Sequence, residues 1–151
     1  MEIHQKHRDL LHFLQGIIYP WRKLTVGIDG ADGVGKSPLA RFLSWQLGMP
    51  TLETDMFLEK GKKYPLIRYD ELSNLIDWRH SLNRPVIVEG IYLLDTLSRI
   101  NIKTDVLIYV EDKNFDGSLT WQTELKQYRE KHDPLGKADY IYKANKNEDY
   151  R

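Results

Sequence analysis

A glycine-rich segment near the start of the chain constrains the fold more than any other feature. Eight consecutive residues match the pattern Gly-x-x-x-x-Gly-Lys-Ser/Thr: Gly30, Ala31, Asp32, Gly33, Val34, Gly35, Lys36 and Ser37. The β-branched run 24–28 precedes them, and apolar residues between 39 and 47 follow at helical spacing. The pattern therefore predicts a tight loop that connects a buried strand to a helix.

This loop has the composition that phosphate binding requires. Glycines allow successive backbone N–H groups to turn toward one point, and the start of a helix adds the positive end of its dipole. The motif lysine reaches the β- and γ-phosphates, and the motif hydroxyl ligates Mg²⁺. We interpret residues 30–37 as a P-loop for MgATP, with Lys36 on the phosphates and Ser37 on the metal. A purely structural glycine-rich turn is the alternative.

Pro38 departs from the usual end of such a loop. A backbone N–H normally faces the α-phosphate here, and proline has none. Proline also biases the residue before it, Ser37, away from helical geometry. We therefore expect weaker nucleotide binding than a threonine at this position would give.

Predicted strands and helices alternate along the chain. The strands are expected at residues 24–28, 51–54, 86–89, 106–110 and 138–142. This order predicts an α/β, three-layer P-loop NTPase fold, with a parallel sheet of about five strands and helices on both faces. We expect one domain over 1–151, with an N-terminal helix within 1–20 and a loose polar tail over 143–151. The loops after Ile28, Thr54 and Val88 should meet at the carboxyl edge of the sheet.

Two acidic residues follow predicted strands at this edge. Asp55 could orient or deprotonate an attacking hydroxyl, although a loop-capping role is the alternative. Glu89 ends the most apolar strand, where a carboxylate can be the second anchor for Mg²⁺. Asp29 and Asp32 flank or lie within the glycine-rich loop, and each could hold the loop geometry or hold water around the metal; local hydrogen bonding in a turn explains both residues at least as well.

The late helical segment offers a basic candidate. Arg129 could close over a transferring phosphate, but acidic and basic residues alternate there, and a salt-bridged surface explains the pattern equally well. Three tryptophans on predicted helices, Trp45, Trp78 and Trp121, are expected to pack in the core, with base stacking as the alternative.

Composition limits the other classes of function. The 151 residues contain no cysteine, which excludes disulfides and thiolate zinc sites. Acidic and basic residues number 22 each, so the net charge predicts neither nucleic-acid nor membrane binding. The first residues are polar, unlike a signal peptide. We expect a cytoplasmic protein whose partner is a small-molecule phosphate acceptor; the sequence leaves the oligomeric state open.

Together these residues resemble the P-loop kinases of the uridine kinase and phosphoribulokinase group. The resemblance rests on Val26 to Gly30, on Asp55-Met56-Phe57, on Val86 to Ile91, on Asp105 to Val110 and on Ala138 to Ile141. It implies that Asp55 is the base or orienting group for the acceptor, and that Lys36 and Ser37 hold phosphate and Mg²⁺. It further implies that Glu89 stands at the metal and that Arg129 belongs to a lid.

Three functions remain open on this basis. The first is a small-molecule kinase that uses MgATP, with a nucleoside or sugar-like metabolite as acceptor. The second is a nucleotide-binding module that transfers no phosphate, which Pro38 favours. The third is a GTP switch, because residues 145–148 partly match the Asn-Lys-x-Asp guanine motif; the glutamate at 148 and the lack of an Asp-x-x-Gly after a strand argue against it.

Overall fold

The computed structural model describes residues 2–149, except for the side chain of Lys146. Five strands form one sheet: β1 (Thr25–Asp29), β2 (Thr51–Glu53), β3 (Val86–Glu89), β4 (Val106–Asp112) and β5 (Tyr140–Ala144). The α-helices are α1 (Gln5–Ile18), α2 (Lys36–Leu47), α3 (Tyr69–Ser81), α4 (Leu93–Arg99), α5 (Gln122–His132), α6 (Pro134–Lys137) and α7 (Lys146–Asp149). Two 3₁₀ turns, η1 (Thr54–Phe57) and η2 (Leu119–Trp121), precede loops or helices.

All neighbouring strands run parallel, in the order β2-β3-β1-β4-β5. The central strand β1 pairs with β3 on one side and with β4 on the other. The chain passes from β1 toward β2 on one side and later crosses to β4 on the other, so the strand order reverses at the end of β1. Such a reversal is where parallel sheets bind ligands.

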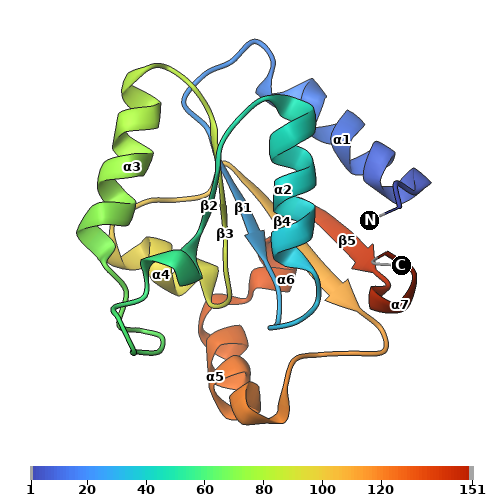
Figure 1. Cartoon of the computed structure of the whole chain (residues 1–151), viewed down its shortest axis with the longest axis vertical. Helices are drawn as coiled ribbons and strands as arrows, with labels where there is room; N and C mark the ends of the chain where they lie inside the picture. Colours follow the sequence, from blue (N-terminus) through green and yellow to red (C-terminus); the bar gives the residue numbers. More distant parts are fainter. Residues whose placement is uncertain (1, 150–151) are drawn as a thin grey trace.

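Helices cover both faces of the sheet, as the alternation of elements predicts. Leu14 of α1 and Leu43 of α2 pack with one set of strand residues, which includes Ile28 and Ile108. On the opposite face, α3 and α4 pack against the alternate strand residues. Figure 1 shows α2 over the sheet and α5 beyond the tips of the strand arrows. Within residues 2–149, none of the helices has the length and apolar character needed to cross a bilayer.

The expected core packing of two tryptophans is wrong. The exposed fraction is 72% for Trp45 and 65% for Trp78. Both helices are amphipathic as expected, but their buried faces are made by other residues, such as Leu43 of α2 and Ile76 of α3. Trp121 is partly buried.

The segment after residue 142 is also more ordered than its polar sequence indicates. Strand β5 continues to Ala144, and α7 follows it directly. The carboxylate of Asp149 is buried, and it accepts a hydrogen bond of 2.7 Å from Lys6 of α1 and one of 2.8 Å from the backbone N–H of Asn145. The polar sequence predicts a loose tail. An ion pair that anchors a segment leaves no apolar periodicity, so the sequence pattern does not reveal it. Residues 150 and 151 lie outside the described part.

Substitution of Gly27 in β1 tests the packing between the sheet and α4. A Cβ atom there would lie 2.6 Å from Cγ2 of Thr104 and 2.9 Å from Cδ2 of Leu93. We expect Gly27→Ala to lower the free energy of unfolding, measured in urea, by about 1–3 kcal/mol because the core is overpacked. Gly16→Ala is the control, because a Cβ atom in α1 meets no atom within 4 Å and alanine favours the helix. An equal response of both variants would contradict this packing.

Candidate functional site: a phosphate-binding loop and its acidic neighbours

The glycine-rich loop lies where the sequence predicts it, between β1 and α2 at the carboxyl edge of the sheet. Gly30 has a φ of 153°, and a Cβ atom there would lie 2.5 Å from the carbonyl oxygen of Val110. Gly33 and Gly35 also have positive φ values. The side chains of Ala31 and Val34 are buried in the core. The loop is therefore anchored by its apolar residues and shaped by its glycines.

Helix α2 begins directly at Lys36 and tolerates Pro38 in its first turn. The first helical hydrogen bond there runs from the N–H of Leu39 to the carbonyl of Gly35. Proline fits because residues of the first turn have no internal acceptor for an N–H. Ser37 is helical. The expectation that Pro38 moves Ser37 out of helical geometry is therefore wrong, whereas its effect on nucleotide affinity stays a prediction.

Lys36 is enclosed by the site. Only 6% of the residue is exposed, and its ammonium donates a hydrogen bond of 2.6 Å to the carbonyl of Ala31. Burial lowers the pKa of Lys36, and the nearby carboxylates, Glu89 foremost, partly offset this effect. A buried ammonium beside a phosphate loop is a strong electrostatic partner for a polyanion.

A group of oxygen ligands lies beside the loop. The Ser37 hydroxyl donates a hydrogen bond of 2.7 Å to Glu89, and burial raises the pKa of this carboxyl. One carboxylate oxygen each from Glu53, Asp55 and Glu89 lie within 4.8 Å of one another. Hard oxygen ligands are those that Mg²⁺ prefers. The residues present therefore fit this metal ion, whereas the role of Ser37 and Glu89 as its ligands stays a prediction.

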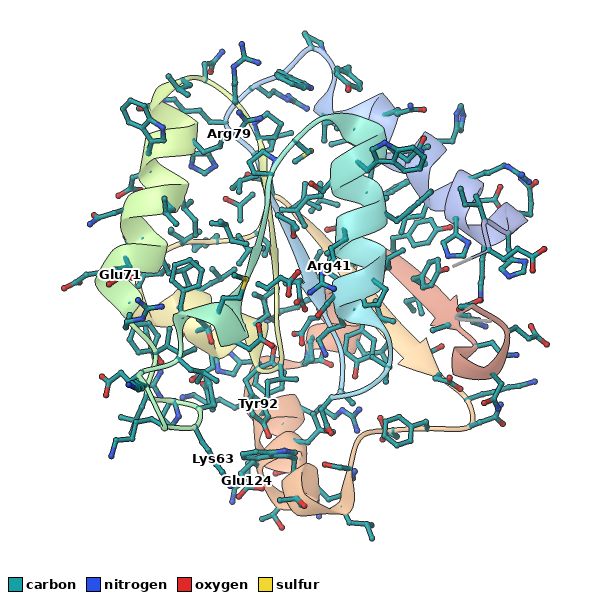
Figure 2. All side chains as sticks on the ribbon, in the orientation of Figure 1. Arg41, Lys63, Glu71, Arg79, Tyr92 and Glu124 are labelled. Carbon is teal, nitrogen blue, oxygen red and sulfur yellow. The ribbon has the colours of Figure 1, made fainter. Side chains whose placement is uncertain are left out.

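Glu53 is a member of this group that the sequence analysis missed. It is buried, and its register partner in the sheet is Glu89. Arg41 of α2 holds it through two hydrogen bonds, of 2.6 and 2.8 Å, one to each carboxylate oxygen (Figure 2). The sequence does carry a signal for Glu53, because it is an acidic residue at the end of a predicted strand, as Glu89 is.

Two aspartates connect the phosphate loop to the segment around α5. Asp29 is buried and accepts hydrogen bonds from the N–H of Gly30 and from the hydroxyl of Tyr128. Asp32 accepts bonds of 3.0 and 3.1 Å from the N–H of Ser118. Both residues therefore fix loop geometry, one of the two roles considered from the sequence. The connection to Tyr128 was not foreseen.

A pocket of about 280 Å³ lies against the phosphate loop. Its lining includes Lys36, Ser37, Asp55 and Glu89, which are four of the five residues that the sequence analysis assigns to catalysis or to the metal. Asp55 is exposed on η1. The lining also includes Leu58, Lys63, Tyr64, Ile67, Ile91 and Trp121.

The structure does not place Arg129 at this pocket. Its guanidinium donates a hydrogen bond of 2.8 Å to Asp116 and one of 3.1 Å to the Tyr109 hydroxyl. These residues line a larger hollow of about 800 Å³ that contains none of residues 30–37. The ion-pair partner of Arg129, Asp116, lies outside the run of alternating charges on α5, and a role of Arg129 in a lid stays a prediction.

The segment that partly matches a guanine motif has a local structural role. Asn145 accepts a hydrogen bond from the N–H of Asn147 at the start of α7. The Lys146 side chain lies outside the described part. Residues 145 and 148 line the larger hollow, away from the phosphate-loop pocket.

Comparison with known proteins adds evidence from structure. No protein-family model and no curated protein matches the sequence. A possible uridine kinase from Bacillus stearothermophilus superposes with a TM-score of 0.67 at 19% identity, over 94% of this chain and 100% of that one. The chain has the fold of the uridine kinase-like P-loop kinases. This P-loop kinase fold also superposes on shikimate kinase from Bacteroides thetaiotaomicron, with a TM-score of 0.50 at 17% identity, over 80% of this chain and 86% of that one.

Removal of the Tyr128 hydroxyl tests its hydrogen bond to Asp29, which connects α5 to the P-loop. Burial raises the pKa of Asp29 from 3.8 to about 6, and the Tyr128 hydrogen bond opposes this rise. Folding therefore favours the protonated carboxyl, and stability falls as pH rises from the unfolded pKa through the folded one. We expect Tyr128→Phe to raise the pKa of Asp29 further, so that this fall extends to higher pH in urea unfolding titrations.

Tyr69→Phe is the control for this titration, because it removes a hydroxyl that donates to the Pro65 carbonyl instead. An unchanged pH profile in Tyr128→Phe would show that the hydroxyl does not act on Asp29.

Proposed function

We propose that the protein is a small-molecule kinase that transfers the γ-phosphoryl group of MgATP to a hydroxyl group. The observation that carries this proposal is the shared pocket of Lys36, Ser37, Glu89 and Asp55. The first three residues suit a metal-bound triphosphate, and Asp55 adds an exposed carboxylate beside them. Because it is exposed, this carboxylate can also contact an acceptor hydroxyl.

The P-loop holds the triphosphate, and the ammonium of Lys36 neutralises charge on its β- and γ-phosphates. Ser37 and Glu89 would hold Mg²⁺, which would supply further charge neutralisation. Asp55 hydrogen-bonds the acceptor hydroxyl and points its oxygen toward the γ-phosphorus. Catalysis in this scheme is mainly positioning and electrostatic stabilisation.

Phosphoryl transfer forms one bond and breaks one. The acceptor oxygen bonds to the γ-phosphorus, while the bond from that phosphorus to the β,γ-bridging oxygen breaks. The hydroxyl proton goes to the Asp55 carboxylate, and ADP leaves with the bridging oxygen. Asp55 then releases the proton to water, for which its exposed position on η1 is suited.

A labelled-ATP transfer assay tests this proposal. The acceptor panel contains nucleosides, sugars and small ring alcohols. We expect label transfer to at least one acceptor, and we expect Asp55→Asn to lower kcat by about 10²–10⁴-fold because the general base is lost. The dissociation constant for MgATP should change much less than kcat, since asparagine keeps one side-chain oxygen in the oxygen-ligand group and Asp55 acts mainly on the acceptor.

Asp70→Asn is the matched control, because Asp70 is an exposed aspartate in the first turn of α3 and lies outside the pocket. MgATP binding with no transfer to any acceptor would favour the nucleotide-binding module instead. Full activity of Asp55→Asn would remove Asp55 from the reaction.

A further inference from the structure

The lining of the pocket beside the P-loop is of two kinds. One group of lining residues, from the P-loop, α2, η1 and the end of β3, is charged or hydroxylic and includes all three lining carboxylates, of Asp32, Asp55 and Glu89. We call the other group the outer end: it is Leu58, Tyr64, Ile67, Ile91 and Trp121, and Lys63 is its one charged member. An acceptor with its hydroxyl at Asp55 has its body at this outer end.

The aromatic residues at the outer end present rings and no free hydroxyl. The Tyr64 hydroxyl donates a hydrogen bond to Asp95, so it is already used. Its ring packs on Tyr92 with centroids 4.6 Å apart, which fixes its orientation. Few polar groups here could replace the hydrogen bonds that a polyhydroxylated body makes to water, whereas a flat ring would stack favourably.

Lys63 adds a positive charge to this apolar end. Its ammonium lies 5.7 Å from the centre of the Trp121 ring, so it reaches from the loop after η1 to the start of α5 (Figure 2). Two further exposed lysines, Lys60 and Lys62, lie in the same loop. The loop therefore attracts anions to the mouth of the pocket.

Backbone hydrogen bonds order the segment that carries Lys63 and Tyr64. Leu58 and Ile67 form an antiparallel bridge, and the N–H of Glu59 donates a hydrogen bond of 2.9 Å to the carbonyl of Leu66. The N–H of Leu66 donates another of 2.9 Å to the carbonyl of Lys63. These bonds fix the backbone from which the side chains of Lys63 and Tyr64 extend.

The geometry points to a compact acceptor: an alcohol with one flat aromatic ring and one anionic substituent, the ring between Tyr64 and Trp121 and the anion on Lys63. The volume of about 280 Å³, shared with the γ-phosphate, leaves room for a single ring. This inference rests on the proposed function and names its substrate class. The acceptor enters with its hydroxyl toward Asp55 and leaves as the phosphate ester.

Calorimetric binding, which needs no turnover, tests this inference. With a non-hydrolysable MgATP analogue present, para-hydroxymethylbenzoate, benzyl alcohol, glucose and uridine are titrated into the protein. We expect para-hydroxymethylbenzoate to bind about tenfold or more tightly than benzyl alcohol, because it adds one charge-assisted contact. Glucose and uridine should bind more weakly than para-hydroxymethylbenzoate.

Two lysines of the same loop provide a matched pair of variants. Lys63→Gln should remove the advantage of the carboxylate, whereas Lys60→Gln should keep it, since only Lys63 lines the pocket. Trp121→Leu should weaken binding of both aromatic alcohols, and Trp121→Phe should restore it. Equal affinity of benzyl alcohol and para-hydroxymethylbenzoate, tighter binding of glucose or uridine, or an unchanged preference in Lys63→Gln would overturn the inference.

The outcome separates this inference from the proposed function. Binding of para-hydroxymethylbenzoate through Lys63 without phosphate transfer would support the acceptor site and count against the kinase. Transfer to glucose or uridine alone would support the kinase and overturn the acceptor class.

Discussion

The parallel register of three strands is the constraint on which the rest of this site depends. Glu53 of β2 is paired with Glu89 of β3, and Glu89 is paired with Ile28 of β1, directly before Asp29 and the P-loop. Every acidic group near the phosphate loop is therefore delivered by the end of a buried strand or by the turn after it. A shift of one residue in any of these pairings would turn an acidic side chain to the opposite face of the sheet.

Burial shifts the pKa values of the charged groups in this site and makes their charged forms less favourable. Asp29, Lys36 and Glu89 are each nearly inaccessible to solvent, and burial opposes the charged form of all three. The hydrogen bonds of the site offset part of this cost: Tyr128 on Asp29, Ser37 on Glu89 and Ala31 on Lys36. A site with this balance is prepared for a ligand that brings both negative charge and a divalent cation.

The sequence predicted the parts of this account that depend on local patterns. The P-loop, the order of strands and helices and the positions of Asp55 and Glu89 follow from a contiguous motif and from periodicity. It did not predict the hydrogen bond between Asp29 and Tyr128, which lie 99 residues apart, because no local pattern records such a pair. It also wrongly predicted that Trp45 and Trp78 are buried. Helical spacing identifies the buried face of a helix, but it does not exclude a large apolar residue on the exposed face.

Calorimetric titration of MgATP measures most directly whether residues 30–37 bind a metal-bound triphosphate. We expect saturable binding of one MgATP, weakened about tenfold or more in Lys36→Ala because a charge-assisted contact to phosphate is lost. Binding should also weaken when EDTA removes Mg²⁺. No binding of MgATP by the unmodified protein, or the same affinity in Lys36→Ala, would contradict binding of the triphosphate at this loop.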